Sequence, residues 1–256
     1  MSTLANARDV LRLLARTQRN LTVTEVAAEL GQPKSSVSRT LSLMADHGFL
    51  QRDPVTLAYG PGELVMGAAY RTRPAESVVS LLGDALADLV HETGCTGYVN
   101  VLDGDHTLVI QMRTSPSNPL QAYTPEGTRA PAYSTSMGRA LLSRLEDEAV
   151  TTLIGGRFDE AVGSAPRDTA QLLKALDAAR ADGWALSSGE IVPNVAGVSS
   201  AVVDPGDFRP YGIGVAFPAR DFDRAQAEEL GFAVRRAAHR VGERIGDPYW
   251  LEFDAS

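Results

Sequence analysis

A short run of hydroxyl and basic side chains, KSSVSR at residues 34–39, has the residue types that contact nucleic acid. Short hydroxyls let a backbone approach DNA closely, and lysine and arginine donate hydrogen bonds to phosphates and base edges. Lys34 is one of only two lysines in the chain, which are Lys34 and Lys174. Apolar residues recur at helical spacing on the other side of the same segment. The pattern therefore predicts a helix whose polar face reads a DNA groove.

The elements that must position this face are two helices joined by a tight turn. Thr22 and Glu25 have the spacing of a capping box, which closes the start of a helix. Gly31 follows the apolar residues of that helix where a left-handed cap favours glycine, and Pro33 can begin the next helix. A helix-turn-helix places its second helix in the major groove. The alternative is an ordinary helical hairpin with a serine-rich, solvated face.

The flanking residues favour DNA binding over that alternative. Residues 49–59 have the pattern of a β-hairpin, a wing, with Arg52 as its main cation and no basic residue at its tip, 56–58. A helix over about 5–16 supplies a third apolar stripe for a shared core. We therefore predict a winged helix-turn-helix over residues 1–60. Its expected DNA contacts are Thr22, Lys34, Ser35, Ser36, Ser38, Arg39 and Arg52.

Charge is divided unequally along the chain. Residues 1–73 hold nine basic and six acidic side chains, whereas residues 74–256 hold 15 basic and 26 acidic ones. The net charge is −8 and the pI is about 5.1. Because attraction to phosphate depends on the local patch rather than on the total, this acidity does not argue against DNA binding.

Composition narrows the class of protein further. The 256 residues allow two domains of roughly 70 and 180 residues, each with a core. No long apolar run and no signal-peptide pattern is visible, so we expect a cytoplasmic protein without a membrane partner. Cys95 is the single cysteine, and the four histidines lack metal-ligand spacing. We expect no metal and no cofactor, and we expect Cys95 to be a packed strand residue.

The remaining residues predict a linker helix and a mixed α/β domain. Residues 61–73 form the linker, and residues 74–256 form the domain. AspGlyAsp at 103–105 is a strong hairpin signal between strands at about 96–102 and 107–113, and a loop covers 114–131. The other expected helices lie at about 75–92, 136–144, 169–181 and 223–245, and the other strands at about 184–187, 195–203 and 210–217. This order favours an antiparallel sheet with helices packed on it.

The order of motifs resembles the IclR family of bacterial transcriptional regulators along essentially the whole chain. LTVTEVAAELGQPKSSVSRTLSLMADHGFLQRDP (21–54) is similar to that family's winged helix-turn-helix. GTRAPAYSTSMGRALLS (127–143) is similar to its signature at the start of an effector-domain helix, and GWALSSGEIVPNVAGVSSAV (183–202) resembles its later strand region. The resemblance implies a GAF/profilin-like α/β effector-binding domain and homodimers that associate into tetramers.

The resemblance also implies an effector site. In members that bind small acids, the ligand lies against the start of the signature helix, where free backbone amides favour an anion. The matching positions in this chain are Ala122, Ala130, Tyr133, Ser136, Met137, Ser187, Gly197, Gly214 and Ala216. Most of these are small, so the pocket has more room and fewer polar anchors than a two- or three-carbon acid needs. We therefore predict a larger, partly apolar effector, such as an aromatic carboxylate. Small residues that only permit close packing are the alternative.

The chain departs from the family signature at three positions. Tyr133, Ser136 and Arg139 stand where the family usually has His, Ala and Lys, so any metal role of that histidine is lost. Tyr133 is either a ligand contact or a packed aromatic whose hydroxyl finds a local partner.

Charged residues near these motifs have two interpretations. Arg113, Arg129 and Arg139 are candidate partners of an effector carboxylate, but the favoured interpretation of each is a surface cation or an internal ion-pair partner. Glu190 is expected to be structural, because an acidic group facing an anionic ligand would cost binding free energy.

Together these patterns predict a ligand-responsive regulator of operator DNA. Effector binding in residues 74–256 would change the relation of two DNA heads through the linker. Repression of a catabolic operon is the default, and activation is the first alternative. An enzyme with a fused DNA-binding head is the second, although the chain has no GxSxG, Walker or HExxH motif, and His91 and His106 lack partners at motif spacing. An architectural DNA binder without a ligand is the third.

Overall fold

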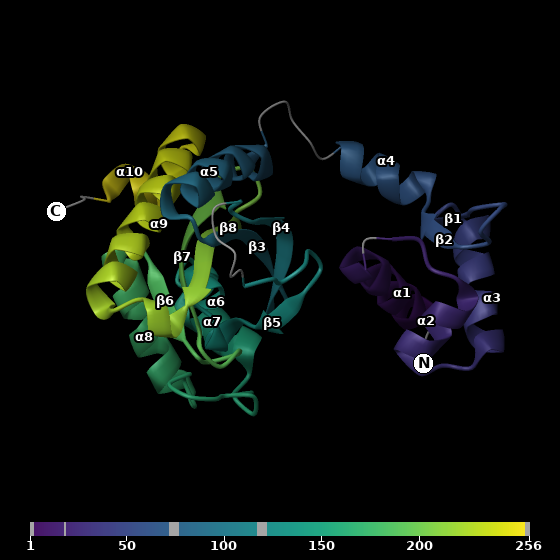
Figure 1. Cartoon of the computed structure of the whole chain (residues 1–256), viewed down its shortest axis with the longest axis horizontal. Helices are drawn as coiled ribbons and strands as arrows, with labels where there is room; N and C mark the ends of the chain where they lie inside the picture. The colour runs from purple at the N-terminus through teal and green to yellow at the C-terminus, as the bar shows by residue number, and fades with distance from the viewer. Residues whose placement is uncertain (1–2, 18, 72–76, 117–121, 254–256) are drawn as a thin grey trace. The chain divides into compact units, whose positions relative to one another are not determined.

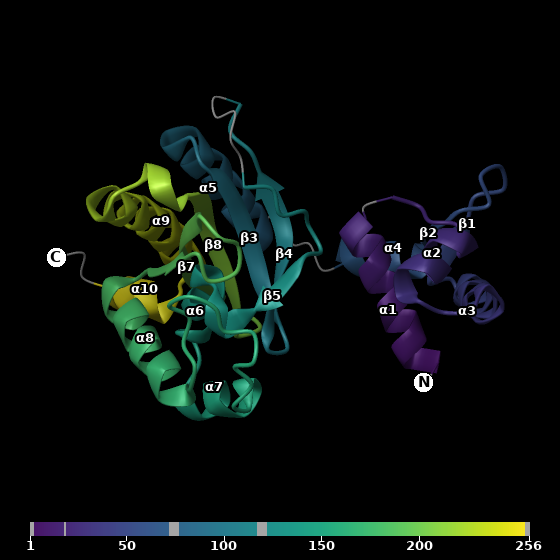
Figure 2. The same ribbon diagram turned by 60° about the horizontal axis from the view of Figure 1, so that its bottom comes forward.

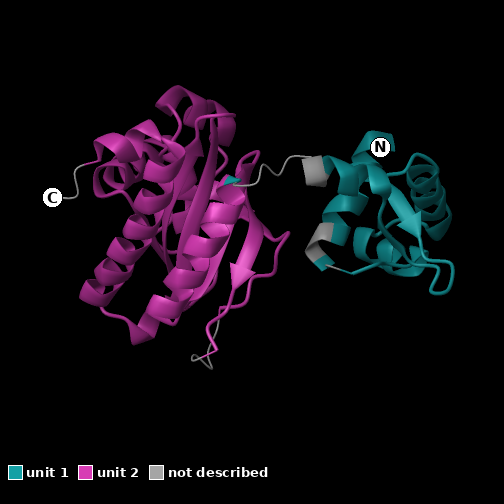
Figure 3. Ribbon diagram, turned by 90° about the horizontal axis from the view of Figure 1, so that it is seen from above, with its two compact units in different colours: residues 1–77 teal, residues 78–256 magenta. Residues whose placement is uncertain are grey.

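The computed structural model describes residues 3–17, 19–71, 77–116 and 122–253. The chain divides into two compact units, residues 1–77 and 78–256 (Figures 1 and 3). Each unit has a hydrophobic core of its own. The predicted end of the linker at residue 73 and the predicted start of the second domain at residue 74 lie outside the described residues. Across the described ranges, no helix has the length and apolarity to cross a membrane.

The first unit consists of three packed helices, a hairpin and a fourth helix. The helices are α1 (Thr3–Thr17), α2 (Val23–Leu30), α3 (Lys34–Asp46) and α4 (Glu63–Arg71), and the antiparallel strands are β1 (Leu50–Arg52) and β2 (Tyr59–Pro61). Each of the first three helices and the hairpin contribute buried residues to the core, among them Val10, Leu13, Val26, Val37, Leu41, Leu50 and Tyr59. This arrangement confirms the predicted winged helix-turn-helix fold.

The linker helix begins later than the sequence suggests. Pro61 is the last residue of β2, where it pairs with Leu50, so it cannot open the helix. The Gly62 amide then donates to the Phe49 carbonyl over 2.9 Å, and the helical residues begin at Glu63. The hairpin therefore runs directly into α4.

The second unit is built on a six-stranded antiparallel sheet in the order β5-β4-β3-β8-β7-β6. The strands are β3 (Thr96–Asp103), β4 (His106–Arg113), β5 (Arg129–Pro131), β6 (Ala185–Ser188), β7 (Val195–Asp204) and β8 (Arg209–Pro218). Helices α5 (Val78–Thr93) and α9 (Arg224–Ile245) cover one face, and α6 (Ser136–Leu142) and α8 (Thr169–Asp182) pack against the other (Figure 2). The predicted mixed α/β domain is confirmed.

The structure contains three short elements that the sequence did not predict. Helix α7 (Asp147–Ile154) buries Val150 and Ile154 in a small cluster beneath α8, and α10 (Pro248–Glu252) buries Trp250 against α9. Strand β5 lies inside the predicted loop and pairs with β4 at the edge of the sheet. Cys95 is buried, one residue before β3 rather than within it.

Candidate functional site

Helix α3 presents the predicted DNA-contact residues on its outer side. Its first six residues have exposed side chains at Lys34, Ser35, Ser36 and Arg39 and a half-buried one at Ser38. The apolar residues of the opposite side, Val37, Leu41 and Met44, are at most 4% exposed. One face of α3 is thus fixed in the core while the other offers hydroxyl and cationic donors to solvent.

The turn before α3 sets where that face begins. Gly31 adopts a left-handed conformation with φ 60°, and the Gln32 amide donates back to the Ala27 carbonyl over 3.1 Å. The Pro33 carbonyl then accepts the amides of Ser36 and Val37 at 3.0 and 3.1 Å. A residue with a side chain at position 31 would strain this backbone conformation.

Thr22 holds the start of α2. Its hydroxyl donates to a Glu25 carboxylate oxygen over 2.7 Å, its backbone amide donates to the same oxygen over 2.8 Å, and Arg19 pairs with Glu25 at 2.7 Å. The hydrogen bond from the Thr22 backbone, followed by that from its hydroxyl, lowers the pKa of Glu25 from 4.5 to about 2. The Thr22 side chain is therefore engaged in the predicted capping box.

Arg52 lies along its own wing. Its Nε donates to the Leu57 carbonyl over 3.5 Å, and its guanidinium carbon is 5.5 Å from the centre of the Tyr59 ring. The tip of the wing is closed by Asp53, whose carboxylate accepts the amides of Val55 and Thr56 at 2.8 Å each. The hairpin carries its cation on a strand, whereas the apolar side chains of Val55 and Leu57 are exposed in the connecting turn.

The second unit contains a cavity of about 400 Å³ between the sheet, the start of α6 and the loop that follows β6. Seven of the nine predicted effector residues line it: Ala130, Ser136, Met137, Ser187, Gly197, Gly214 and Ala216. These residues come from segments far apart in sequence, and the fold brings them together around one cavity. The cavity is large enough for an aromatic acid.

Ala122 and Tyr133 do not line this cavity. The Ala122 carbonyl accepts a hydrogen bond from the hydroxyl of Tyr98, which does line it. The Tyr133 ring points into a separate hollow, where it makes an edge contact with Phe158 at 4.9 Å and its hydroxyl accepts the Glu160 amide at 3.1 Å. Tyr133 therefore fits its alternative interpretation, a packed aromatic with a local partner.

Two of the predicted glycines are needed for close packing as well as for the cavity lining. A Cβ at Gly214 would collide with the Ser199 hydroxyl, and one at Gly197 would lie 3.0 Å from the Ser136 hydroxyl. Ser136 and Ser199 are joined by a hydrogen bond of 2.9 Å. Both interpretations of the small residues, room for a ligand and close approach of the backbone, therefore apply here.

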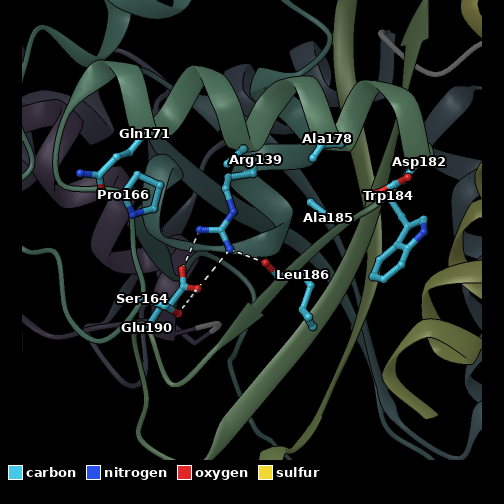
Figure 4. A pocket seen from close by; sticks show the side chains of 12 residues that line it. Arg139, Ser164, Pro166, Gln171, Ala178, Asp182, Trp184, Ala185, Leu186 and Glu190 are labelled. Carbon is cyan, nitrogen blue, oxygen red and sulfur yellow. Dashed lines mark hydrogen bonds and ion pairs between the residues drawn. The ribbon is translucent and has the colours of Figure 1, made fainter. Parts of the chain in front are cut away.

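The three candidate arginines have different surroundings. Arg129 lines the cavity and forms an ion pair with Asp103 at 2.8 Å. Arg139 pairs with Glu190 at 2.6 Å and donates to the Leu186 carbonyl, as Figure 4 shows in a view of a neighbouring pocket that the same pair lines. Arg139 also donates to the Tyr133 carbonyl over 3.1 Å. Arg113 is exposed and lies outside the cavity lining. An internal ion pair is thus the observed role of Arg139.

Glu190 joins two segments around the cavity. Its carboxylate accepts from Arg139 and, over 3.0 Å, from the Ser164 hydroxyl (Figure 4). Glu190 also lines the cavity, although its charge is neutralised by the arginine. This agrees with the structural role expected for it.

Asn100 is a cavity residue that the sequence analysis missed. It lies on β3, is 4% exposed and lines the cavity. The family motifs do not include this strand, so matching motifs could not find it. The available signal was a lone polar amide in an otherwise apolar strand, VNVL at 99–102.

Comparison with known proteins agrees with the geometry of both units. The family model described as the bacterial transcriptional regulator IclR C-terminal domain matches residues 75–243, and that of the IclR helix-turn-helix domain matches residues 3–54.

Individual relatives match nearly the whole chain. The HTH-type transcriptional regulator BhcR of Paracoccus denitrificans is 28% identical over 241 residues, which cover 93% of this chain and 85% of that protein. The glycerol operon regulatory protein of Streptomyces griseus is 28% identical over 253 residues, which cover 96% of this chain and 97% of that protein. The crystal structure of an IclR homologue from Microbacterium hydrocarbonoxydans complexed with 4-hydroxybenzoate has a TM-score of 0.76 at 17% identity. The match covers 96% of this chain and 99% of that chain. The chain belongs to the IclR family of ligand-responsive, DNA-binding transcriptional regulators.

Proposed function

We propose that this regulator is a repressor of a catabolic operon and that an aromatic carboxylate, or another organic acid of similar size, is its effector. The observation that carries the effector class is the cavity of about 400 Å³, whose lining is mainly apolar and small. A two-carbon acid would leave most of such a cavity unfilled. A flat ring buries its faces against alanine, valine and methionine side chains instead.

Relatives support the same proposal. The homologue from Microbacterium hydrocarbonoxydans holds 4-hydroxybenzoate, and a relative from Salmonella typhimurium is an acetate operon repressor, 24% identical to this chain. Family members thus include proteins with an aromatic acid bound and proteins that repress a catabolic operon. In the proposed mechanism the acid binds more tightly to the form with low operator affinity, so it releases the repressor from DNA.

The DNA contacts of the proposal lie mainly on α3. Lys34 and Arg39 are its exposed cations, and Ser35 and Ser36 are exposed between them. We place Arg52 second, because its guanidinium already contacts Tyr59 and the Leu57 carbonyl. Palindromic operators are read by two heads, so the proposal includes a homodimer or a tetramer of this chain.

Calorimetric titration of the full chain with 4-hydroxybenzoate, benzoate and acetate tests the effector class. The proposal expects binding of at least one aromatic acid and none of acetate at the same concentrations. Tighter binding of acetate would contradict it. Recovery of the aromatic acid unchanged after incubation is expected of a sensor, and turnover would favour the enzyme alternative.

A further inference from the structure

One polar side chain of the cavity lining has no hydrogen-bond partner for its oxygen. Asn100 is 4% exposed, and its Oδ1 atom is buried without a partner among the described residues. Buried polar groups in folded proteins are nearly always paired, because an unpaired acceptor lowers stability. An acceptor that is left open in the lining of a ligand cavity therefore calls for a donor from outside the chain.

The backbone of β3 directs Asn100 to the cavity side of the sheet. Val99 belongs to the core beneath α5 and α9, whereas Tyr98 and Asn100 line the cavity. The pairing of β3 with β4 shifts register between Val99 and Asn100, which is a β-bulge. Bulges commonly re-aim a side chain beside a functional site.

The strand neighbours of Asn100 offer its oxygen no donor. Val109 lies opposite it on β4, and Gly212 lies opposite it on β8. Neither residue has a polar side chain, and the Val109 amide donates to the Thr128 carbonyl over 3.0 Å.

Three hydroxyl groups of the cavity already bond to other groups of the chain. Ser136 and Ser199 bond to each other over 2.9 Å, and the Thr107 hydroxyl donates to the Ala130 carbonyl over 3.4 Å. Arg129, a cation of the lining, is paired with Asp103.

We propose that Asn100 is a specificity determinant of this cavity and that its side-chain oxygen accepts a hydrogen bond from a hydroxyl group of the effector. This inference rests on the proposed organic acid effector and adds that the acid carries a hydroxyl besides its carboxylate. An ionised carboxylate has no proton to donate and cannot pair with this oxygen, whereas a hydroxyl can. A site built to bond a hydroxyl disfavours the analogue that lacks it, because the buried acceptor then stays unpaired.

Calorimetry of the full chain with benzoate, 3-hydroxybenzoate and 4-hydroxybenzoate tests the assignment. The wild type is expected to bind one of the hydroxylated acids about tenfold more tightly than benzoate. Asn100→Leu should remove this preference by weakening the hydroxylated acid while leaving benzoate affinity unchanged. Val109→Ala, which alters the same cavity beside Asn100, should change all three affinities by a similar factor. Ligand-free Asn100→Leu should melt at or above the wild-type temperature, because it no longer buries an open acceptor.

Several results would overturn the inference. An equal loss of all three affinities in Asn100→Leu, or a lower melting temperature without ligand, would show that Asn100 only supports the fold. Equal wild-type affinity for all three acids would reject the hydroxyl contact at Asn100, without contradicting the proposal that the effector is an aromatic acid. Failure of the wild type to bind any of the three would reject the proposed effector class itself, and the inference with it.

Discussion

Arg139 and Glu190 form an ion pair of 2.6 Å in which each side chain is only 6% exposed. Arg139 lies on α6, the helix whose first residues, Ser136 and Met137, line the effector cavity. Glu190 lies in the loop between β6 and β7 and lines the same cavity. The pair therefore ties together two walls of the site, and it does so without presenting an unneutralised charge to an anionic ligand.

Breaking this pair should destabilise the second unit strongly. Arg139→Met leaves a buried carboxylate without its cation, which is expected to lower the free energy of unfolding by about 3–5 kcal/mol. Both tryptophans of the chain, Trp184 and Trp250, lie in this unit, so fluorescence during denaturant unfolding reports on it. Arg224→Met is the matched control, because it removes an exposed ion pair with Glu228. It should lower the free energy of unfolding by less than about 1 kcal/mol. A similar small loss for both variants would refute this role of Arg139.

Lys34 and Arg39 should differ in what they contribute to DNA binding. Lys34→Ala is expected to weaken binding to all sequences alike and to reduce the salt slope by about 1, as for a phosphate contact. If Arg39 reads a base edge, Arg39→Ala should weaken the free energy of operator binding by about 1–3 kcal/mol and relax the preference at one base pair. Lys174→Ala, which changes the only other lysine, an exposed residue of α8, is the control and should leave binding unchanged. Wild-type affinity and salt slope in both head variants would rule out α3 as the reading helix.

The capping box of α2 should titrate in acid. The hydrogen bonds from Thr22 lower the pKa of Glu25 to about 2 from its usual 4.5. Because the folded pKa is the lower one, the ionised carboxylate stabilises α2 fully above pH 4.5, and this contribution is lost as the pH falls towards about 2. An NMR titration of the Glu25 carboxylate should show the low midpoint. Thr22→Val keeps the backbone amide, so its Glu25 midpoint should rise only part of the way towards 4.5. A midpoint near 4.5 in the wild type would disprove the capping arrangement.

Filling the cavity should exclude ring-sized effectors. Ala216 is half-buried and lines the cavity from β8. Ala216→Leu adds a branched side chain to the space, so calorimetry should show loss of aromatic-acid binding while the melting temperature of the free protein changes little. Ala161→Leu, a half-buried alanine outside the cavity lining, should retain binding. Retained affinity in Ala216→Leu would place the acid elsewhere.

Much of the fold follows from local sequence signals, and the misses have physical causes. Gly31, the Thr22 capping box and AspGlyAsp at 103–105 act through neighbouring residues, so the structure has the predicted turns there. Helix α7 and strand β5 are short, and their contacts come from α8 and β4, which are distant in sequence. Pro61 has the pattern of a helix start, and only its pairing with Leu50 reveals a strand.

The candidate site divides in the same way. Family motifs locate the small residues around Ser136 and Gly197, which the fold gathers on one cavity. They also suggest Tyr133, which is the middle residue of the short helical turn over Ala132–Ser134 and lines a different hollow. Asn100 escapes prediction, because what distinguishes it is an unpaired oxygen, a property of the packed structure.

Control of DNA binding by the effector cavity is tested by measuring operator affinity with and without the aromatic acid. Operator DNA selected from a random library by the full chain is titrated with the protein, and fluorescence anisotropy is followed at zero and at saturating aromatic acid. We expect the acid to lower operator affinity by roughly 5- to 150-fold, the usual range of coupling between two sites, and we expect no such response from Ala216→Leu. Operator affinity that stays the same while calorimetry shows the acid bound would contradict control of the DNA head by this cavity.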